Sequence, residues 1–372
     1  MLSFPSGHSA RIPRGSSLLM DLPPPILPPP PPPRRRWWRL SLVIIAIGVA
    51  LGLSLAYITI PYYTLGPGPA KDVSQLVHIS GGERTYASSG TFFLTTVAVS
   101  TQPISLFQGF VGWLDPSVSV VPRSAIVRPG LTDQQQDQYN VLDMQESKYA
   151  ALLAALEALR IPTPPIPGAR VIGVAMGFPA EGKLKEGDLI VAVDGVTVKD
   201  AASAVRPIVA KPVHSRVTVT VMRGGKRVTT QMRTVASPLE SDKGRPVLGV
   251  RLAPAVLLPF DVTIDSENIG GPSAGLAFAL TITDELTPED LTRGHHIAVT
   301  GTIDPNGNVG PVGGVEFKIK AAEKEGADTF LAPASEVDEA RRATSHLRVI
   351  GVQTLTEAIA DLRTLALLAP AR

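Results

Sequence analysis

The spacing of hydrophobic residues changes several times along this chain, and the first change predicts a membrane-spanning helix. Leu40 to Ile60 is an uncharged and mostly apolar run of 21 residues. A helix of about 20 apolar residues spans the hydrocarbon core of a bilayer. Ser54-Leu55-Ala56 also places small residues at the spacing of a signal-peptidase site, so a cleaved signal is the competing interpretation. The 39 residues ahead of the run favour an uncleaved anchor.

The residues before the apolar run indicate its orientation. Four arginines and two tryptophans precede it: Arg34, Arg35, Arg36, Arg39, Trp37 and Trp38. Basic residues stay on the cytoplasmic side of a span, and tryptophans favour the membrane interface. We therefore expect a transmembrane helix in residues 37–60, a cytoplasmic N-terminus and an extracellular catalytic part.

The first 36 residues are rich in proline. They contain Pro23–Pro25 and Pro28–Pro33. This composition predicts a disordered or polyproline II tail. Such a tail could bind a proline-recognising partner, but a bare spacer is the preferred interpretation.

Beyond the apolar run, the periodicity predicts a mixed α and β structure. Thr91 to Val99 has the pattern of a strand. Five apolar residues then mark one face of a helix: Tyr149, Leu152, Leu153, Leu156 and Leu159. A proline-rich link at residues 161–167 ends this unit. Val217–Met222 and Arg227–Met232 follow as a strand pair around Gly224-Gly225.

Ser273 stands where a predicted helix begins. Residues 261–268 have the pattern of a strand followed by a loop. Residues 274–280 are apolar on all sides, which predicts a buried helix. The free N–H groups and positive dipole end of such a helix can hold the oxyanion of a tetrahedral intermediate. In a second interpretation, Ser273 only caps the helix.

Lys318 is predicted to face the protein interior. In a helix starting near Val315, the neighbours of Lys318 one turn away are apolar: Val315, Ala321 and Ala322. Lys320, by contrast, shares its face with Glu316, Glu323 and Lys324. Burial lowers the pKa of a lysine, which suits it to act as a general base toward a serine hydroxyl. The alternative is a half-buried lysine whose ammonium reaches out to water.

Composition excludes several classes of function. The chain has 372 residues and is 44% hydrophobic, enough to bury two domain cores. A net charge of +2, without a basic stripe interleaved with aromatics, argues against a nucleic-acid partner. The absence of cysteine excludes thiolate chemistry. His295 and His296 precede a strand, where neighbouring side chains face opposite ways, so we do not expect the two to share a metal. We expect no metal and no cofactor.

Three motifs in the C-terminal part resemble the proteolytic domain of the Lon proteases. They are Gly-Pro-Ser-Ala-Gly at residues 271–275, Thr300-Gly301, and Gly313-Gly314 followed by Lys318, with Ala321-Ala322 before Gly326-Ala327. Residues 144–147, which lead into an Ala/Leu helix, resemble the first helix of that domain. The resemblance implies Ser273 as the nucleophile, Lys318 as the general base and Thr300 as the residue that orients the lysine amine.

The chain departs from the Lon pattern at one position. The family has an acidic residue three positions before the serine, where this chain has Gly270. Glu267 and Asp265 are the nearby acids that could replace it.

Residues 168–236 resemble a bacterial PDZ domain. The most specific element is Gly-Asp-Leu-Ile-Val-Ala-Val-Asp-Gly at residues 187–195. PDZ domains bind an extended chain as an added strand and often capture its C-terminus. The resemblance places the peptide groove near Met176, Gly177 and Phe178. The plainer interpretation is a small β domain that separates others.

The order of these parts predicts an α+β Lon-like domain, residues 61–160 and 237–372, with the PDZ-like domain inserted between its halves. This combination resembles the membrane-anchored, PDZ-containing Lon-like proteases of Gram-positive bacteria. It implies a serine endopeptidase that cleaves exposed or unfolded protein segments at the outer membrane face. The resemblance also allows a homo-oligomer. No GxxxxGK[ST] phosphate loop occurs, so we expect no dependence on ATP.

Two other functions fit parts of the sequence. A catalytically silent, membrane-anchored PDZ scaffold would retain the same domains without hydrolysis. An α/β-hydrolase would use the Gly-x-Ser-x-Gly at residues 271–275 as a nucleophile elbow, with His346 as its histidine.

Overall fold

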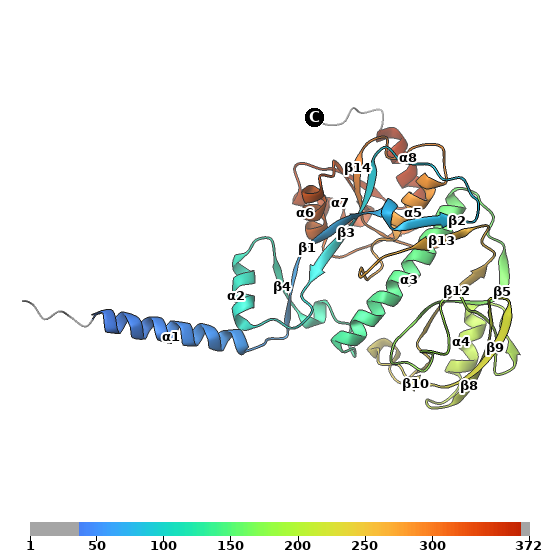
Figure 1. Cartoon of the computed structure of the whole chain (residues 1–372), viewed down its shortest axis with the longest axis horizontal. Helices are drawn as coiled ribbons and strands as arrows, with labels where there is room; N and C mark the ends of the chain where they lie inside the picture. Colours follow the sequence, from blue (N-terminus) through green and yellow to red (C-terminus); the bar gives the residue numbers. More distant parts are fainter. Residues whose placement is uncertain (1–36, 366–372) are drawn as a thin grey trace, which may run out of the picture. The chain divides into compact units, whose positions relative to one another are not determined.

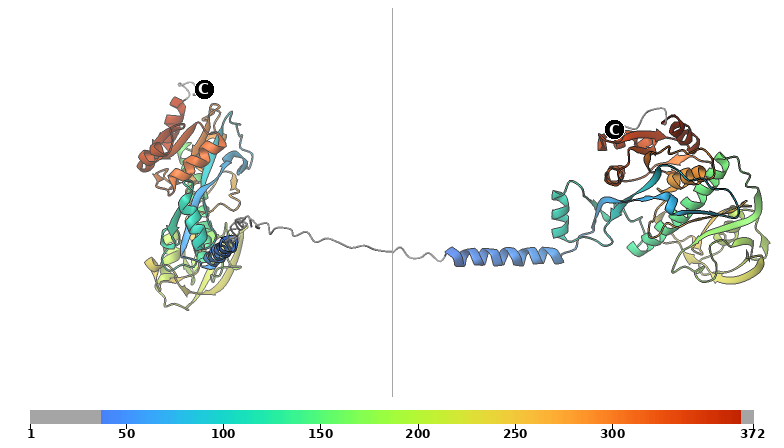
Figure 2. Two further views of the ribbon diagram at one scale, coloured as in Figure 1. Left: turned by 90° about the vertical axis from the view of Figure 1, so that its left-hand side faces the viewer. Right: turned by 45° about the horizontal axis from the view of Figure 1, so that its top comes forward.

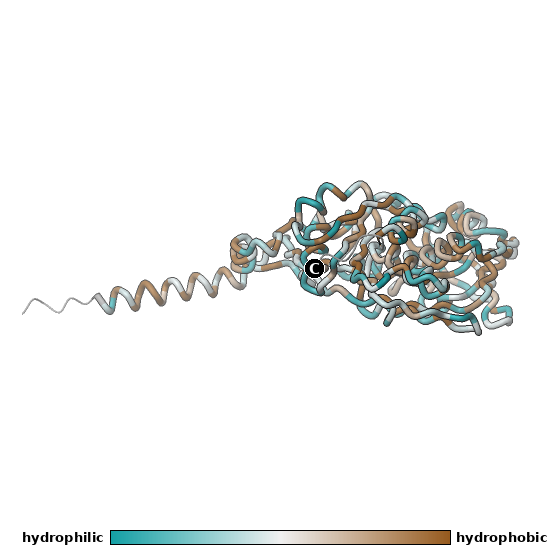
Figure 3. The backbone as a smooth tube through the Cα atoms, turned by 90° about the horizontal axis from the view of Figure 1, so that it is seen from above, coloured by the Kyte–Doolittle hydropathy of each residue, from teal (hydrophilic) through white to brown (hydrophobic). Residues whose placement is uncertain are grey.

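The computed structural model describes residues 37–365, and the predicted proline-rich tail at residues 1–36 lies outside them. The chain divides into two units, one ending at Leu53 and one beginning at Ser54. The described part of the first unit belongs to helix α1 (Trp37–Tyr57). Residues Trp38–Tyr57 are long and apolar enough to cross a bilayer, and hydrophobic residues recur along the helix (Figure 3).

Six strands form the main sheet of the second unit, in the order β18-β17-β14-β3-β1-β4. Figure 1 labels β14, β3, β1 and β4 of this sheet. Their bounds are Tyr62–Asp72 (β1), Thr91–Val99 (β3), Ser119–Pro122 (β4), His296–Val299 (β14), Thr329–Pro333 (β17) and Arg348–Val352 (β18). β1 pairs antiparallel with β3 and β4, whereas β3, β14, β17 and β18 run parallel. The predicted strand at Thr91–Val99 is confirmed. One sheet thus unites sequence from both sides of the PDZ-like segment.

Helices cover both faces of this sheet. Successive residues of a strand face opposite sides, so neighbouring residues pack against different helices. Ile297 and Val299 of β14 pack with α3 (Asp133–Ala158), α5 (Gly275–Glu285) and α8 (Leu355–Leu365). Ala298, between them, packs with α6 (Val315–Glu325) and α7 (Val337–Ala343). In Figure 2 the C-terminal elements of this layered part are orange and red, and the PDZ-like part is yellow-green.

The PDZ-like module builds a second sheet and its own core. The strand order is β12-β5-β6-β8-β9, and β7 pairs with β6. The bounds are Pro165–Val174 (β5), Leu189–Val193 (β6), Val196–Thr197 (β7), Arg216–Arg223 (β8), Lys226–Arg233 (β9) and Val250–Val256 (β12). Helix α4 (Ala201–Val209) starts with a capping box between Asp200 and Ser203. The predicted strand pair around Gly224-Gly225 is β8–β9. Strand β12 lies past residue 236, where the sequence pattern ends the module.

Short elements complete the second unit. β2 (Val77–Ser80) pairs with β13 (Asp261–Ile264), β10 (Val235–Ala236) with β11 (Pro246–Val247), and β15 (Thr302–Ile303) with β16 (Val309–Gly310). Helix α2 (Leu106–Leu114) begins with a capping box between Ser105 and Gln108. The turn η4 (Ala334–Glu336) joins β17 to α7.

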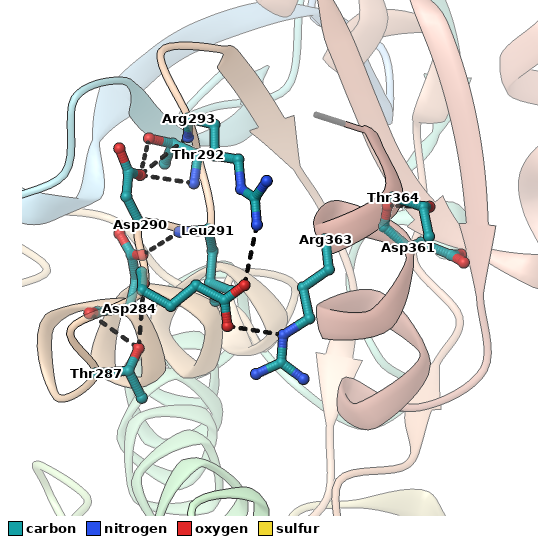
Figure 4. A network of polar contacts seen from close by, with 10 residues as sticks. Asp284, Thr287, Asp290, Leu291, Thr292, Arg293, Asp361, Arg363 and Thr364 are labelled. Carbon is teal, nitrogen blue, oxygen red and sulfur yellow. Dashed lines mark hydrogen bonds and ion pairs between the residues drawn. The ribbon is translucent and has the colours of Figure 1, made fainter. Parts of the chain in front are cut away.

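A polar network fastens the connection between α5 and β14 to helix α8 (Figure 4). Glu289 accepts hydrogen bonds from Arg293 at 3.1 Å and from Arg363 at 2.9 Å. Partial burial disfavours the ionised form of Asp290 and acts to raise its pKa. Hydrogen bonds, including those from Ser89 and from the Arg293 amide, outweigh burial and lower the Asp290 pKa to about 2. The loop that leads into β14 is therefore held from both sides.

Candidate active site

Ser273 lies in the loop that enters α5, and it does not cap that helix. The N-cap is Ala274, which provides no side-chain hydrogen bond. The interpretation of Ser273 as a capping serine is therefore wrong. Within the described residues, the Ser273 hydroxyl has no hydrogen-bond partner. Its position on the outer side of a buried helix start leaves that hydroxyl available to a ligand.

The serine loop is held by helix α3. The Gly271 amide donates to the Asn140 carbonyl at 2.8 Å, and the Ser147 hydroxyl donates to the Pro272 carbonyl at 3.0 Å. Gly271 has φ +88°, a conformation that favours glycine. These bonds fix the backbone on the N-terminal side of Ser273. Sequence reasoning did not identify Asn140 or Ser147 as supports of this loop.

Thr300 and Gly301 hold Ser273 from the other side. They follow β14 and precede β15, so they lie between two strands. The Gly301 amide donates to the Ser273 carbonyl at 3.0 Å, and the Thr300 hydroxyl reaches the same oxygen at 3.4 Å. A Cβ at Gly301 would lie 3.0 Å from a methyl of Val309. This close approach explains why a glycine follows Thr300.

Lys318 of α6 points into the protein, as the helix-face argument predicts. Its side chain is among the buried residues at 2% exposure, and Val315, Ala321 and Ala322 are buried beside it. The Lys318 Nζ donates to the Thr300 Oγ1 at 2.9 Å. Lys320 is only partly buried, and its Nζ donates to the Pro116 carbonyl at 3.1 Å.

Burial lowers the pKa of Lys318 to about 8, because the ammonium loses its hydration. The negative charge of Glu336 opposes this shift. Glu336 closes η4, and its Oε2 is buried without a hydrogen-bond partner among the described residues. Sequence reasoning missed Glu336, and its place just after a buried strand was the one available signal.

Ser273 and Lys318 line the same cavity of about 630 Å³. Its walls come from β1, β3, α3, the serine loop and the segment before α6, including Leu94, Thr95, Met144, Ile269 and Val312. Thr300 lies behind this wall and contacts both Ser273 and Lys318. The structure therefore brings all three predicted residues together.

The acidic residues near the serine do not contact Lys318. Glu267 lines the cavity but forms an ion pair with Lys71, which lines it as well. Asp265 accepts a hydrogen bond from the Glu267 amide at 2.9 Å. A Cβ on Gly270 would lie 3.0 Å from the Asn140 Cβ, so a larger residue at position 270 would press against α3. The packing of α3 thus explains the glycine.

The amides of Ser273 and Ala274 point to a site for a negative charge. Neither donates a hydrogen bond to another group in the described part of the chain. Both precede the first turn of α5, where the helix dipole favours an anion. They are the candidate donors of an oxyanion hole.

A second cavity, of about 560 Å³, lies between α4 and β12 of the PDZ-like module, and Tyr139, Leu142 and Asp143 of α3 also line it. Phe178, Val205, Ile208 and Val250 are among its lining residues. Of the predicted groove residues, Phe178 lines this cavity, whereas Met176 and Gly177 do not. The chain turns at Gly177 with φ +75°, and Met176 is 57% exposed. Sequence reasoning missed β12, whose partner β5 is distant in the chain.

Among the residues that the structure describes, the strand and histidine that an α/β-hydrolase requires do not lie next to Ser273. The preceding strand, β13, ends at Ile264 and is followed by a loop rather than by the serine. His346 is exposed, and it does not line the cavity of Ser273.

Comparison with known families identifies the two folded parts. Residues 266–366 match the Lon protease (S16) C-terminal proteolytic domain, and residues 136–234 match the PDZ domain. The chain carries a PDZ domain and a Lon-type proteolytic domain. The Lon-type domain supports a serine protease, and it contains Ser273, Thr300, Lys318 and Glu336.

Each of the individual relatives matches about a quarter of this chain. Lon protease 2 of Bacillus subtilis is 36% identical over 96 residues, which are 25% of this chain and 17% of that protein. The Lon protease of Campylobacter concisus is 36% identical over 94 residues, 24% of this chain and 11% of that protein. The chain thus spans less than a fifth of these relatives. The PDZ domain of the SdrC-like protein from Listeria monocytogenes is 27% identical with a TM-score of 0.22, covering 24% of this chain and 90% of that one.

Proposed function

We propose that this chain is a membrane-tethered serine endopeptidase that hydrolyses peptide bonds without ATP, with Ser273 as nucleophile and Lys318 as general base. One observation carries the proposal: Ser273 and Lys318 line one cavity, while Thr300 contacts both from behind it. A lysine with a pKa of about 8 is partly neutral near physiological pH, as a general base must be.

In the proposed first step, the neutral Lys318 amine takes the proton of the Ser273 hydroxyl as Oγ attacks the carbonyl carbon. The amides of Ser273 and Ala274 receive the resulting oxyanion. The tetrahedral intermediate then collapses, the Lys318 ammonium gives its proton to the leaving amine, and an acyl ester remains on Ser273.

In the second step, a water molecule loses its proton to the regenerated Lys318 amine and attacks the ester. The Lys318 ammonium returns that proton to Ser273 Oγ as the acid product leaves. Thr300 keeps the amine in place throughout by accepting its hydrogen bond. No other acid or base is needed.

The proposed substrates are protein segments that are already extended. The sequence contains no phosphate loop for ATP, and a chain without an unfoldase cuts only locally unfolded segments. Helix α1 would hold the enzyme at the outer membrane face, with the arginines before it on the cytoplasmic side.

The PDZ domain would select substrates by a tail bound between α4 and β12. β12 is the edge strand of its sheet and pairs only with β5 among the described strands. An extended peptide can therefore be added beside it. The amides of Leu248 and Gly249 donate no hydrogen bond to any described residue, which suits them to a terminal carboxylate.

Hydrolysis of an unstructured protein by the full-length chain in detergent, without nucleotide, tests the proposal. Ser273→Ala and Lys318→Ala should each abolish turnover. Lys320→Ala, on the same helix but partly exposed, is the matched control and should retain it. Turnover that persists in both dyad variants would refute the dyad. A folded wild-type chain without any turnover would favour the catalytically silent PDZ scaffold.

A further inference from the structure

Helix α2 (Leu106–Leu114) exposes an apolar face that the proposed function does not use. Its sequence, Leu-Phe-Gln-Gly-Phe-Val-Gly-Trp-Leu, contains no charge. Six large apolar side chains are exposed on it: Leu106, Phe107, Phe110, Val111, Trp113 and Leu114. Trp113 reaches 76% exposure. Soluble surfaces rarely gather so many large apolar groups on one short helix without a contact to make.

The opposite side of α2 is fixed to the protein by glycines. A Cβ at Gly112 would lie 2.9 Å from a methyl of Val120, and one at Gly109 would lie 3.3 Å from Ile60. The glycines allow the helix backbone to approach β4 and the start of β1 closely. The aromatic side chains are therefore held outward by a rigid support.

Hydrogen bonds place the start of α2 next to the end of the candidate span. The Leu106 amide donates to the Ile58 carbonyl at 2.9 Å, and the Ile60 amide donates to the Ile104 carbonyl at 2.8 Å. Ile58 directly follows Tyr57, the last residue of α1. The position of α2 relative to the exit of the chain is thus set by short backbone contacts.

The thickness of a bilayer indicates at which depth α2 begins. The 20 residues Trp38–Tyr57 reach about 30 Å as a helix, which equals the hydrocarbon thickness. Ile58 then enters the headgroup layer, which is roughly 5–8 Å deep on each side. A helix bonded to Ile58 begins in that layer.

We propose that α2 is an interfacial helix that inserts Phe107, Phe110 and Trp113 among the lipid headgroups and upper acyl chains of the outer leaflet. The inference rests on the membrane anchor of the proposed function. Lipid is favoured over a second copy of the chain because the hydrogen bond from Leu106 to Ile58 ties the start of α2 to the end of the candidate span. Tryptophan and phenylalanine are also the side chains that bind at a membrane interface.

Tryptophan fluorescence in lipid vesicles tests this inference. The chain has three tryptophans, and replacing Trp37→Phe and Trp38→Phe leaves Trp113 as the single emitter. The full-length variant is reconstituted into phosphatidylcholine vesicles with and without acyl-chain bromine. We expect blue-shifted emission from Trp113 and loss of most of that emission in brominated vesicles.

Carbonate extraction of the same vesicles separates the anchor from α2. Unquenched Trp113 in protein that resists extraction overturns the inference while the anchor stands. Unquenched Trp113 in protein that carbonate removes overturns both. A blue shift without bromine quenching, with more than one copy per particle, shows that a second copy covers α2 and also overturns the inference.

Two single substitutions test whether the quenching of Trp113 depends on the apolar face of α2. Phe110→Ser on α2 should reduce the quenching of Trp113, because it removes apolar area from the inserted face. Val196→Ser in the PDZ domain, which changes an equally exposed apolar residue far along the chain, should leave the quenching unchanged. Equal effects of the two variants would contradict a role for α2.

Discussion

The Lys318 ammonium donates a hydrogen bond of 2.9 Å to the Thr300 hydroxyl, and the same hydroxyl lies 3.4 Å from the carbonyl oxygen of Ser273. One buried side chain therefore connects the candidate base with the backbone of the candidate nucleophile. Because Thr300 follows β14 directly, its position is set by the main sheet rather than by a loop.

Replacing Thr300 with valine should lower kcat/KM without unfolding the protein. Valine keeps the shape of threonine but leaves the buried Lys318 amine without its acceptor, which costs about 1–3 kcal/mol. The expected loss is roughly 5- to 150-fold. Thr300→Ser restores the acceptor and should recover most of the activity, as measured on a peptide substrate. Equal activity of the valine and serine variants would show that the hydrogen bond does not position the lysine.

The activity should rise with pH through about 8. Below the Lys318 pKa of about 8 the lysine is protonated and cannot act as a base. Above it the neutral amine predominates, so the acidic limb of kcat/KM should be centred near that value. A limb centred near the ordinary pKa of histidine, about 6.5, would point to a different base.

Removing the charge of Glu336 should shift this limb to lower pH. The Glu336 carboxylate raises the pKa of Lys318 against the effect of burial, so Glu336→Gln should lower that pKa. The neutral amine is then present at lower pH. Glu316→Gln, an exposed change on the helix of Lys318, is the control and should leave the limb in place. A limb that stays fixed in Glu336→Gln contradicts the electrostatic contact.

Burial of Lys318 should lower the free energy of unfolding of the protein. The folded Lys318 pKa of about 8 lies below the ordinary lysine value of 10.5. The unfolded chain therefore binds more protons between these values, and stability rises with pH across that window. At pH 7 the full cost applies, up to about 3 kcal/mol. Lys318→Met should raise the free energy of unfolding at pH 7, measured with urea, whereas Lys320→Met should change it little. A destabilised Lys318→Met protein would contradict this.

A charge in the cavity between α4 and β12 should separate protein cleavage from peptide cleavage. Val205 lines this cavity, so Val205→Glu should impair cleavage of a protein that presents a C-terminal tail. A short peptide that does not need the PDZ domain should be cleaved as before. Ala202→Glu, on the exposed side of α4, is the matched control. Equal loss toward both substrates in Val205→Glu would refute the division of labour.

Local patterns in the sequence pointed to Ser273 and Lys318 as candidate site residues, and Thr300 came from the resemblance to the Lon proteases. The orientation of Lys318 and Lys320 follows from helix geometry, and the burial of α5 follows from its uniform apolarity. Glu336, Ser147 and β12 were not predicted, because their roles depend on contacts between segments far apart in the chain. The predicted groove at Met176 and Gly177 failed to match the cavity for the same reason, since its wall includes β12.

The central claim is that Lys318 activates Ser273, and covalent labelling tests it most directly. The full-length protein is treated with a fluorophosphonate, and the modified residue is located by peptide mass spectrometry. We expect a single adduct on Ser273, formed at a rate that rises with pH through about 8 in the wild type and is lost in Lys318→Met, in line with the lowered pKa of Lys318. An adduct on another residue, or unchanged labelling of Ser273 in Lys318→Met, would contradict the account.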